Sequence, residues 1–83
     1  MTAEEVAAIV RSVVAETFAV DAAAVHAGMV AKDIAGWDSL QHTVLLIRLQ
    51  TRLGLRLPAR QLVSARSVGD LTTVLAAALG AKE

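Results

Sequence analysis

Three segments of this chain carry apolar residues at the spacing of a helix, and no segment shows the two-residue alternation of a half-buried strand. The three segments are residues 3–18, 39–53 and 68–79. Each follows a residue whose side chain can cap the N-terminus of a helix, namely Thr2, Asp38 and Ser67. Repeated helical stripes with start signals predict an all-α chain.

The connections between these segments complete the predicted architecture. Gly54 and Gly80 supply left-handed stops after the second and last helices. Pro58 favours an extended backbone before it, and a short further helix is predicted over residues 59–63. We therefore expect a four-helix bundle with three main helices, one short third helix and a long loop over residues 19–37.

Composition limits how such a bundle is stabilised. The 83 residues suit one domain, which we expect to cover residues 1–83. Phe18 and Trp37 are the only aromatic residues, so the core must be built from aliphatic side chains. Because cysteine is absent, the chain can form no disulfide and offers no thiolate for a metal or for catalysis.

Charge and hydropathy argue against several kinds of partner. The formal net charge is zero, which does not favour a nucleic-acid binder. No stretch is long and apolar enough to span a bilayer. The first residues carry negative charge, whereas a signal peptide begins with positive charge. We expect a cytoplasmic monomer with no membrane partner, and Met1 ahead of a complete first helix favours a free-standing protein.

The loop over residues 19–37 is unusually long for a compact domain. Four apolar side chains are scattered along it: Val25, Met29, Val30 and Ile34. Their spacing is not helical, but they can anchor the loop onto the bundle. We therefore predict a loop that is packed by its own side chains.

The second predicted helix has two apolar stripes rather than one. The first stripe consists of Leu45, Leu46, Leu49 and Leu53, and the second consists of Leu40, Val44 and Ile47. One stripe is enough to dock a helix on its own core. The other needs a second surface, which is either the long loop or a partner protein.

The stretch GWDSLQH at residues 36–42 holds the residue types of a nucleophilic triad. Asp38, Ser39 and His42 are close in sequence, but no glycine-rich turn is available to build an oxyanion hole. His26 and His42 lack a third ligand at metal spacing. We predict neither an enzyme nor a metal site, and locally Ser39 can be either a helix-capping residue or a modification site.

The order of these features resembles the acyl carrier proteins. The resemblance covers nearly the whole chain: EEVAAIVRSVVAETF, then KDIAGWDSLQHTVLLIRLQTRLGLRLP, then SVGDLTTVLAAAL. It implies a four-helix bundle of acyl-carrier type in which the serine of an Asp-Ser-Leu motif carries 4′-phosphopantetheine. In this chain the motif is Asp38, Ser39 and Leu40, so the resemblance implies covalent attachment of the cofactor to Ser39.

The resemblance also implies what the protein does and with which partners. It implies a non-catalytic shuttle that holds acyl or aminoacyl groups as thioesters. The implied partners are a phosphopantetheinyl transferase, an acyl- or aminoacyl-loading enzyme, and ketosynthase, acyltransferase or condensation-type enzymes. The implied docking residues lie on the second helix beside Ser39, and they are Leu40, Val44, Ile47, Arg48 and Arg52.

One departure from the family narrows the expected role. Fatty-acid carriers bear acidic residues along the second helix, whereas this helix has arginines and no acid between Asp38 and Asp70. A basic docking patch would not attract such a surface. We expect a role in polyketide or related natural-product biosynthesis, antibiotic biosynthesis included. Two alternatives remain: an aminoacyl or peptidyl carrier of a nonribosomal pathway, and an unmodified helical interaction module in which Ser39 only caps the helix.

Overall fold

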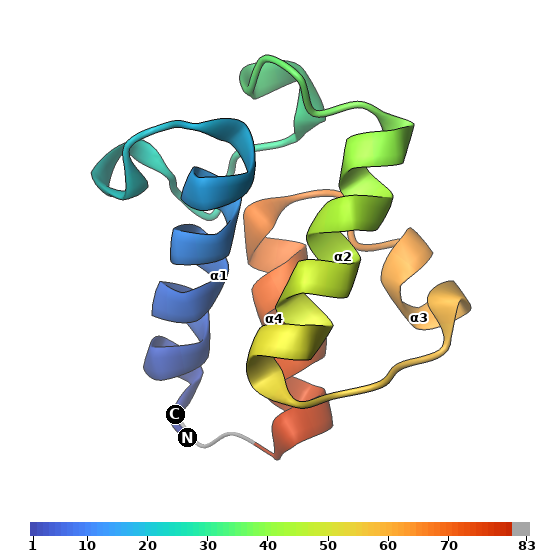
Figure 1. The fold of residues 1–83 in the computed structure, drawn as a ribbon. Helices are drawn as coiled ribbons and strands as arrows, with labels where there is room; N and C mark the ends of the chain where they lie inside the picture. The colour runs from blue at the N-terminus through green and yellow to red at the C-terminus, as the bar shows by residue number, and fades with distance from the viewer. Residues whose placement is uncertain (81–83) are drawn as a thin grey trace.

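A computed structural model describes residues 1–80 of the chain, and within that range it contains four α-helices and no strand. The helices are α1 (Ala3–Phe18), α2 (Ser39–Leu53), α3 (Ala59–Val63) and α4 (Val68–Leu79). In Figure 1, α1, α2 and α4 form the body of the bundle and α3 lies at its side. The predicted all-α bundle and its helix boundaries are confirmed.

The core lies where α1 packs against both α4 and α2. Val6, Val10 and Val13 of α1 are buried, as the helical spacing predicts. Val14 and Ala15 are buried too, although they lie outside the stripe that the helical spacing predicts, which consists of Val6, Ile9, Val10, Val13 and Thr17. The position of α1 explains the burial of these two side chains. Because this helix packs against α2, α4 and the Ala22–Ala24 turn, it needs a wider apolar face than a single stripe supplies.

The helix ends follow the predicted signals. The Thr2 hydroxyl accepts a hydrogen bond from the Glu5 amide at 3.1 Å, and the Glu5 carboxylate accepts one from the Thr2 amide at 2.9 Å. Gly54 and Gly80 end α2 and α4 with φ of 67° and 65°, a left-handed conformation that glycine adopts without strain.

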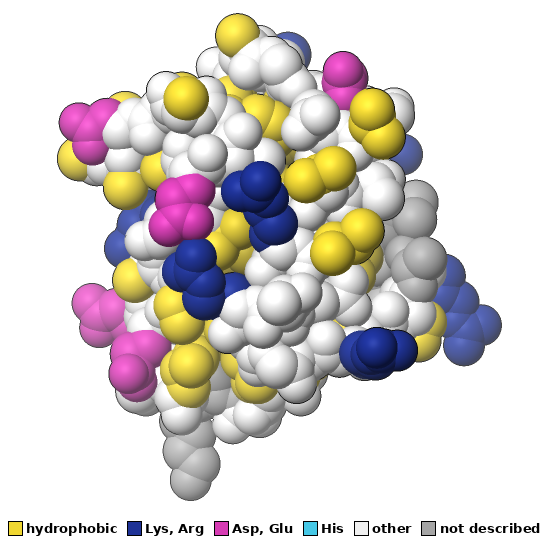
Figure 2. Space-filling view, viewed as in Figure 1, with side chains coloured by type: hydrophobic (Ala, Val, Ile, Leu, Met, Phe, Trp, Pro, Cys, Tyr) yellow, Lys and Arg dark blue, Asp and Glu magenta, His cyan; other side chains and the backbone are white. Residues whose placement is uncertain are grey.

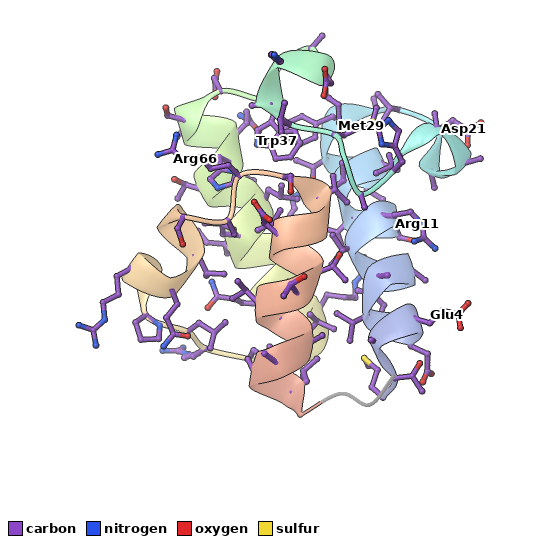
Figure 3. The ribbon with its side chains drawn as sticks, turned by 180° about the vertical axis from the view of Figure 1, so that it is seen from behind. Glu4, Arg11, Asp21, Met29, Trp37 and Arg66 are labelled. Carbon is purple, nitrogen blue, oxygen red and sulfur yellow. The ribbon has the colours of Figure 1, made fainter. Side chains whose placement is uncertain are left out.

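The loop between α1 and α2 is packed, as predicted, and it also contains two short 3₁₀ turns that the sequence pattern did not indicate. These turns are Ala22–Ala24 and Ala31–Asp33. Val25 and Ile34 are buried in the core, and Met29 is packed against it. Figure 3, seen from behind, shows Met29 and Trp37 at the end of the bundle that this loop closes.

Backbone hydrogen bonds join the loop to the N-terminus of α4. The Val68 amide donates to the Met29 carbonyl at 2.9 Å, and the Gly69 amide donates to the Ala27 carbonyl at 2.8 Å. A Cβ at position 69 would lie 3.0 Å from the Ala27 oxygen. Glycine at this position therefore allows the loop to approach α4 closely.

Candidate functional site

Ser39 is the first residue of α2, and the helix is capped by the residue before it. The Asp38 carboxylate accepts a hydrogen bond from the Gln41 amide at 2.8 Å, while the Asp38 carbonyl accepts one from the His42 amide at 2.8 Å. Ser39 is exposed, and its hydroxyl forms no hydrogen bond to any group among residues 1–80. Asp38 therefore caps α2, and the Ser39 hydroxyl is left for other chemistry.

The first turn of α2 offers hydrogen-bond donors beside that hydroxyl. The amides of Ser39 and Leu40 have no acceptor within the described part of the chain. Unpaired amides and the positive end of the helix dipole both favour an anion. Ser39 thus combines an accessible hydroxyl with a setting that suits an attached phosphodiester.

The chain has three other serines, and the structure gives each a different setting. Ser12 is half-buried in the middle of α1. The Ser67 hydroxyl accepts a hydrogen bond from the Asp70 amide at 3.0 Å, so it caps α4. Ser64 is exposed but follows the C-terminus of the five-residue α3, where the helix dipole disfavours an anion. Ser39 alone combines exposure with the N-terminus of a long helix.

Trp37 fixes the segment that leads into Ser39. Its side chain is only 6% exposed and stacks on Phe18 of α1 with ring centroids 5.3 Å apart. It also stacks on His42, and the indole Nε1–H donates to His42 Nδ1 at 3.0 Å. Sequence reasoning considered His42 only as a triad or metal residue and missed this contact, although the five-residue separation from Trp37 across a helix start could have suggested it.

The second stripe of α2 is an exposed apolar surface. Leu40 is 69% exposed and Ile47 is 58% exposed, while Val44 between them is half-buried. Leu45 and Leu49 on the other stripe are fully buried. The long loop therefore does not cover the second stripe. Figure 2 shows hydrophobic side chains on the outer face of α2.

The two predicted docking arginines have different surroundings. Arg48 is exposed and forms no ion pair within residues 1–80. Arg52 is paired with Glu16 of α1 at 3.0 Å, and basic and acidic side chains meet over this boundary in Figure 2. An exposed pair of this kind contributes little to stability. It does, however, offset the charge of Arg52, so Arg48 is the stronger basic feature of the face.

A groove of about 530 Å³ adjoins the far end of this face. It lies between the C-terminal half of α2 and the connection to α3. Gln50 holds that connection, because its side-chain oxygen accepts from the Leu57 amide at 2.8 Å and its nitrogen donates to the Leu46 carbonyl at 3.2 Å. The apolar pattern of α2 gave no signal for this clamp.

Two further properties bear on the class of the site. Within residues 1–80, no three or more His, Asp or Glu side chains are grouped so that they could hold a metal ion. None of the described helices has both the length and the apolar character needed to cross a bilayer.

Comparison with known families identifies the class. Residues 8–75 match the family described as "Phosphopantetheine attachment site". No curated protein matches the chain. The family match covers most of the chain, which therefore belongs to this family of phosphopantetheine-carrying domains. Such domains bear 4′-phosphopantetheine covalently on a serine, are generally non-catalytic, and interact with a phosphopantetheinyl transferase and with biosynthetic enzymes.

The residues of the α2 N-terminus fit this cofactor. Attachment requires an accessible serine hydroxyl, and the phosphodiester that results carries a negative charge. The free hydroxyl of Ser39 and the unpaired amides of Ser39 and Leu40 meet these two requirements.

Proposed function

We propose that Ser39 is the residue that carries 4′-phosphopantetheine and that the protein is an acyl carrier protein. The observation that carries this proposal is the free, exposed Ser39 hydroxyl in the first turn of a helix that Asp38 already caps. The match to the phosphopantetheine attachment family supports the proposal. The other three serines do not combine an exposed position with the N-terminus of a long helix.

In this proposal the chain presents and orients the arm and catalyses no reaction. When attached, the group supplies a terminal thiol that holds an acyl or aminoacyl cargo as a thioester. The chain itself has no cysteine that could do so. Asp38 keeps the first turn of α2 formed, and the amides of Ser39 and Leu40 stabilise the phosphodiester. We infer that one carrier domain spans residues 1–83.

We further propose that partner enzymes dock on the exposed face of α2. Leu40 and Ile47 provide apolar contact, Val44 fills the space between them, and Arg48 supplies positive charge. Such a face suits an enzyme with an apolar spot beside a neutral or acidic patch. This charge argues for polyketide or related natural-product biosynthesis rather than fatty-acid synthesis. An aminoacyl carrier with its own loading enzyme fits the same surface.

Modification of Ser39 is tested by intact mass. The purified chain is incubated with coenzyme A, magnesium and a broad-specificity phosphopantetheinyl transferase. We expect one added phosphopantetheine in the wild type and in Ser67→Ala, and none in Ser39→Ala. A folded wild-type chain that gains no mass would favour the interaction module instead, and an unchanged gain in Ser39→Ala would assign the cofactor to another serine.

The docking face is tested with Val44→Asp and Arg48→Glu once a loading enzyme is known. We expect both variants to keep the helical circular dichroism of the wild type and to be loaded about tenfold more slowly or worse, because each places a negative charge on the face. Arg11→Glu on α1 is the matched control for a change of charge. Loading at the wild-type rate in both α2 variants would reject this face.

A further inference from the structure

His42 lies one helical turn after Ser39 and is the only α2 side chain that is hydrogen-bonded to the loop before the helix among the described residues. Its imidazole stacks on Trp37 with centroids 5.9 Å apart. Trp37 in turn stacks on Phe18 at the end of α1. The three rings form a continuous stack from α1 through the loop to the first turn of α2, beside the proposed attachment serine.

The hydrogen bond between these rings fixes the protonation state of His42. Because the indole nitrogen of Trp37 can only donate, His42 Nδ1 must accept and must carry no proton. The imidazole is therefore neutral, with its proton on Nε2. An imidazolium has two N–H donors and no acceptor, so protonation of His42 breaks this bond and leaves the buried Trp37 Nε1–H without a partner.

The surroundings of His42 also favour the neutral form. The pKa of His42 is lowered from its ordinary value of 6.5. The larger cause is partial burial, and the smaller cause is the positive charge of Arg66. Arg66 comes from the connection between α3 and α4 and lies at the same end of the bundle in Figure 3. The Asp38 carboxylate, just before α2, accepts a hydrogen bond from the Gln41 amide, and Glu16 near the end of α1 is paired with Arg52.

We propose that His42 is a positioning residue for Ser39: its neutral imidazole holds Trp37, and through it the segment 34–38, against the first turn of α2, and protonation releases that segment. The proposal rests on Ser39 as the attachment serine. Trp37 is two residues from Ser39, and its amide also donates to the Ile34 carbonyl at 3.3 Å. Release of the indole therefore loosens the backbone that presents the serine to the transferase.

The sign of the pH dependence follows from the direction of the pKa shift. The folded-state pKa of His42 is below its unfolded value, so the unfolded chain binds the proton more readily. The stability that neutral His42 contributes is complete above about pH 6.5 and is lost as the pH falls through the folded-state pKa. The release occurs at mildly acidic pH.

Trp37 is the only tryptophan, so its fluorescence reports on the contact directly. In the unmodified wild-type chain we expect a fluorescence transition with a midpoint below pH 6.5. His42→Gln, which does not titrate, and His42→Phe, which keeps a ring but has no acceptor, should lack the transition. His26→Gln, at an exposed histidine in the loop, should keep it. The same transition in His42→Phe, or its loss in His26→Gln, would overturn the proposal.

The positioning role is tested by the rate of phosphopantetheine addition at pH 7.5 and at pH 5.5 with one transferase. The pH response of the transferase cancels when wild type and His42→Gln are compared. We expect the wild-type rate to fall at least about threefold more than the rate of the variant, since displacement of the serine slows the transfer. Equal ratios would reject the positioning role.

Failure of the positioning role and failure of the proposed function give different results. If the wild type gains no mass at either pH, or if Ser39→Ala gains mass as the wild type does, Ser39 is not the attachment residue, whatever the fluorescence shows. If only Ser39→Ala fails to gain mass, and wild type and His42→Gln share the same pH response, Ser39 is the attachment residue and His42 does not position it.

Discussion

The N-termini of α2 and α4 are built from similar sequence signals but are used differently. Each has a side-chain cap, Asp38 for α2 and Ser67 for α4. At α4 the next two amides donate to carbonyls of the long loop, and the serine hydroxyl is engaged in capping. At α2 the corresponding amides and the Ser39 hydroxyl remain unpaired within the described residues. The N-terminus of α4 is therefore occupied by contacts within the fold, whereas the N-terminus of α2 remains available for a covalent group.

The largest effect on stability is expected at the N-terminus of α4, whose amides are hydrogen-bonded to the loop. Gly69→Ala should reduce the free energy of unfolding by about 1–3 kcal/mol, because the new methyl group would meet the Ala27 carbonyl at 3.0 Å and push the loop away. In an ordinary helix position the same change is stabilising by about 1 kcal/mol. Urea unfolding measures the difference, and a stabilised Gly69→Ala chain would contradict the close contact.

Amide hydrogen exchange compares the two ends without mutation. The amides of Val68 and Gly69 are hydrogen-bonded to the loop, so they should exchange at least about tenfold more slowly than those of Ser39 and Leu40 after correction for sequence. Exchange measured by NMR on the unmodified chain provides this comparison. Equal protection at the two helix ends would mean that the α2 amides have a partner and are not available to an anion.

A smaller effect on stability is expected to distinguish Ser67 from Ser39. Ser67→Ala removes a cap and should cost about 1 kcal/mol of stability. Ser39→Ala removes no hydrogen bond from an exposed position, and its effect should stay within about 0.5 kcal/mol. Thermal unfolding of the two variants gives both values. A loss in Ser39→Ala as large as that in Ser67→Ala would show that Ser39 has a structural role after all.

Helix positions and the packed loop could be predicted from the sequence because local signals determine them. Capping residues such as Thr2 and glycine stops such as Gly54 act within one or two turns of the chain. The exposed second stripe was also visible in the spacing of Leu40 and Ile47, although whether the loop covered it depended on tertiary structure.

The contacts that join distant segments could not be predicted in the same way. The hydrogen bonds from α4 to Met29 and Ala27 depend on where the loop folds back, and the clamp at Gln50 depends on the path of the chain toward α3. The Trp37–His42 bond requires a specific helix entry angle. Composition indicated only that Trp37 was available to pack.

The proposed function depends most on which serine is modified, and the chain allows a direct measurement. Its four serines fall on four different tryptic peptides, because an arginine or lysine separates each from the next. Digestion of the modified chain followed by mass spectrometry therefore locates the added group. We predict the phosphopantetheine mass on the peptide of residues 33–48, which contains only Ser39. The same mass on the peptide of residues 67–82, 61–66 or 12–32 would contradict the assignment of the cofactor to Ser39.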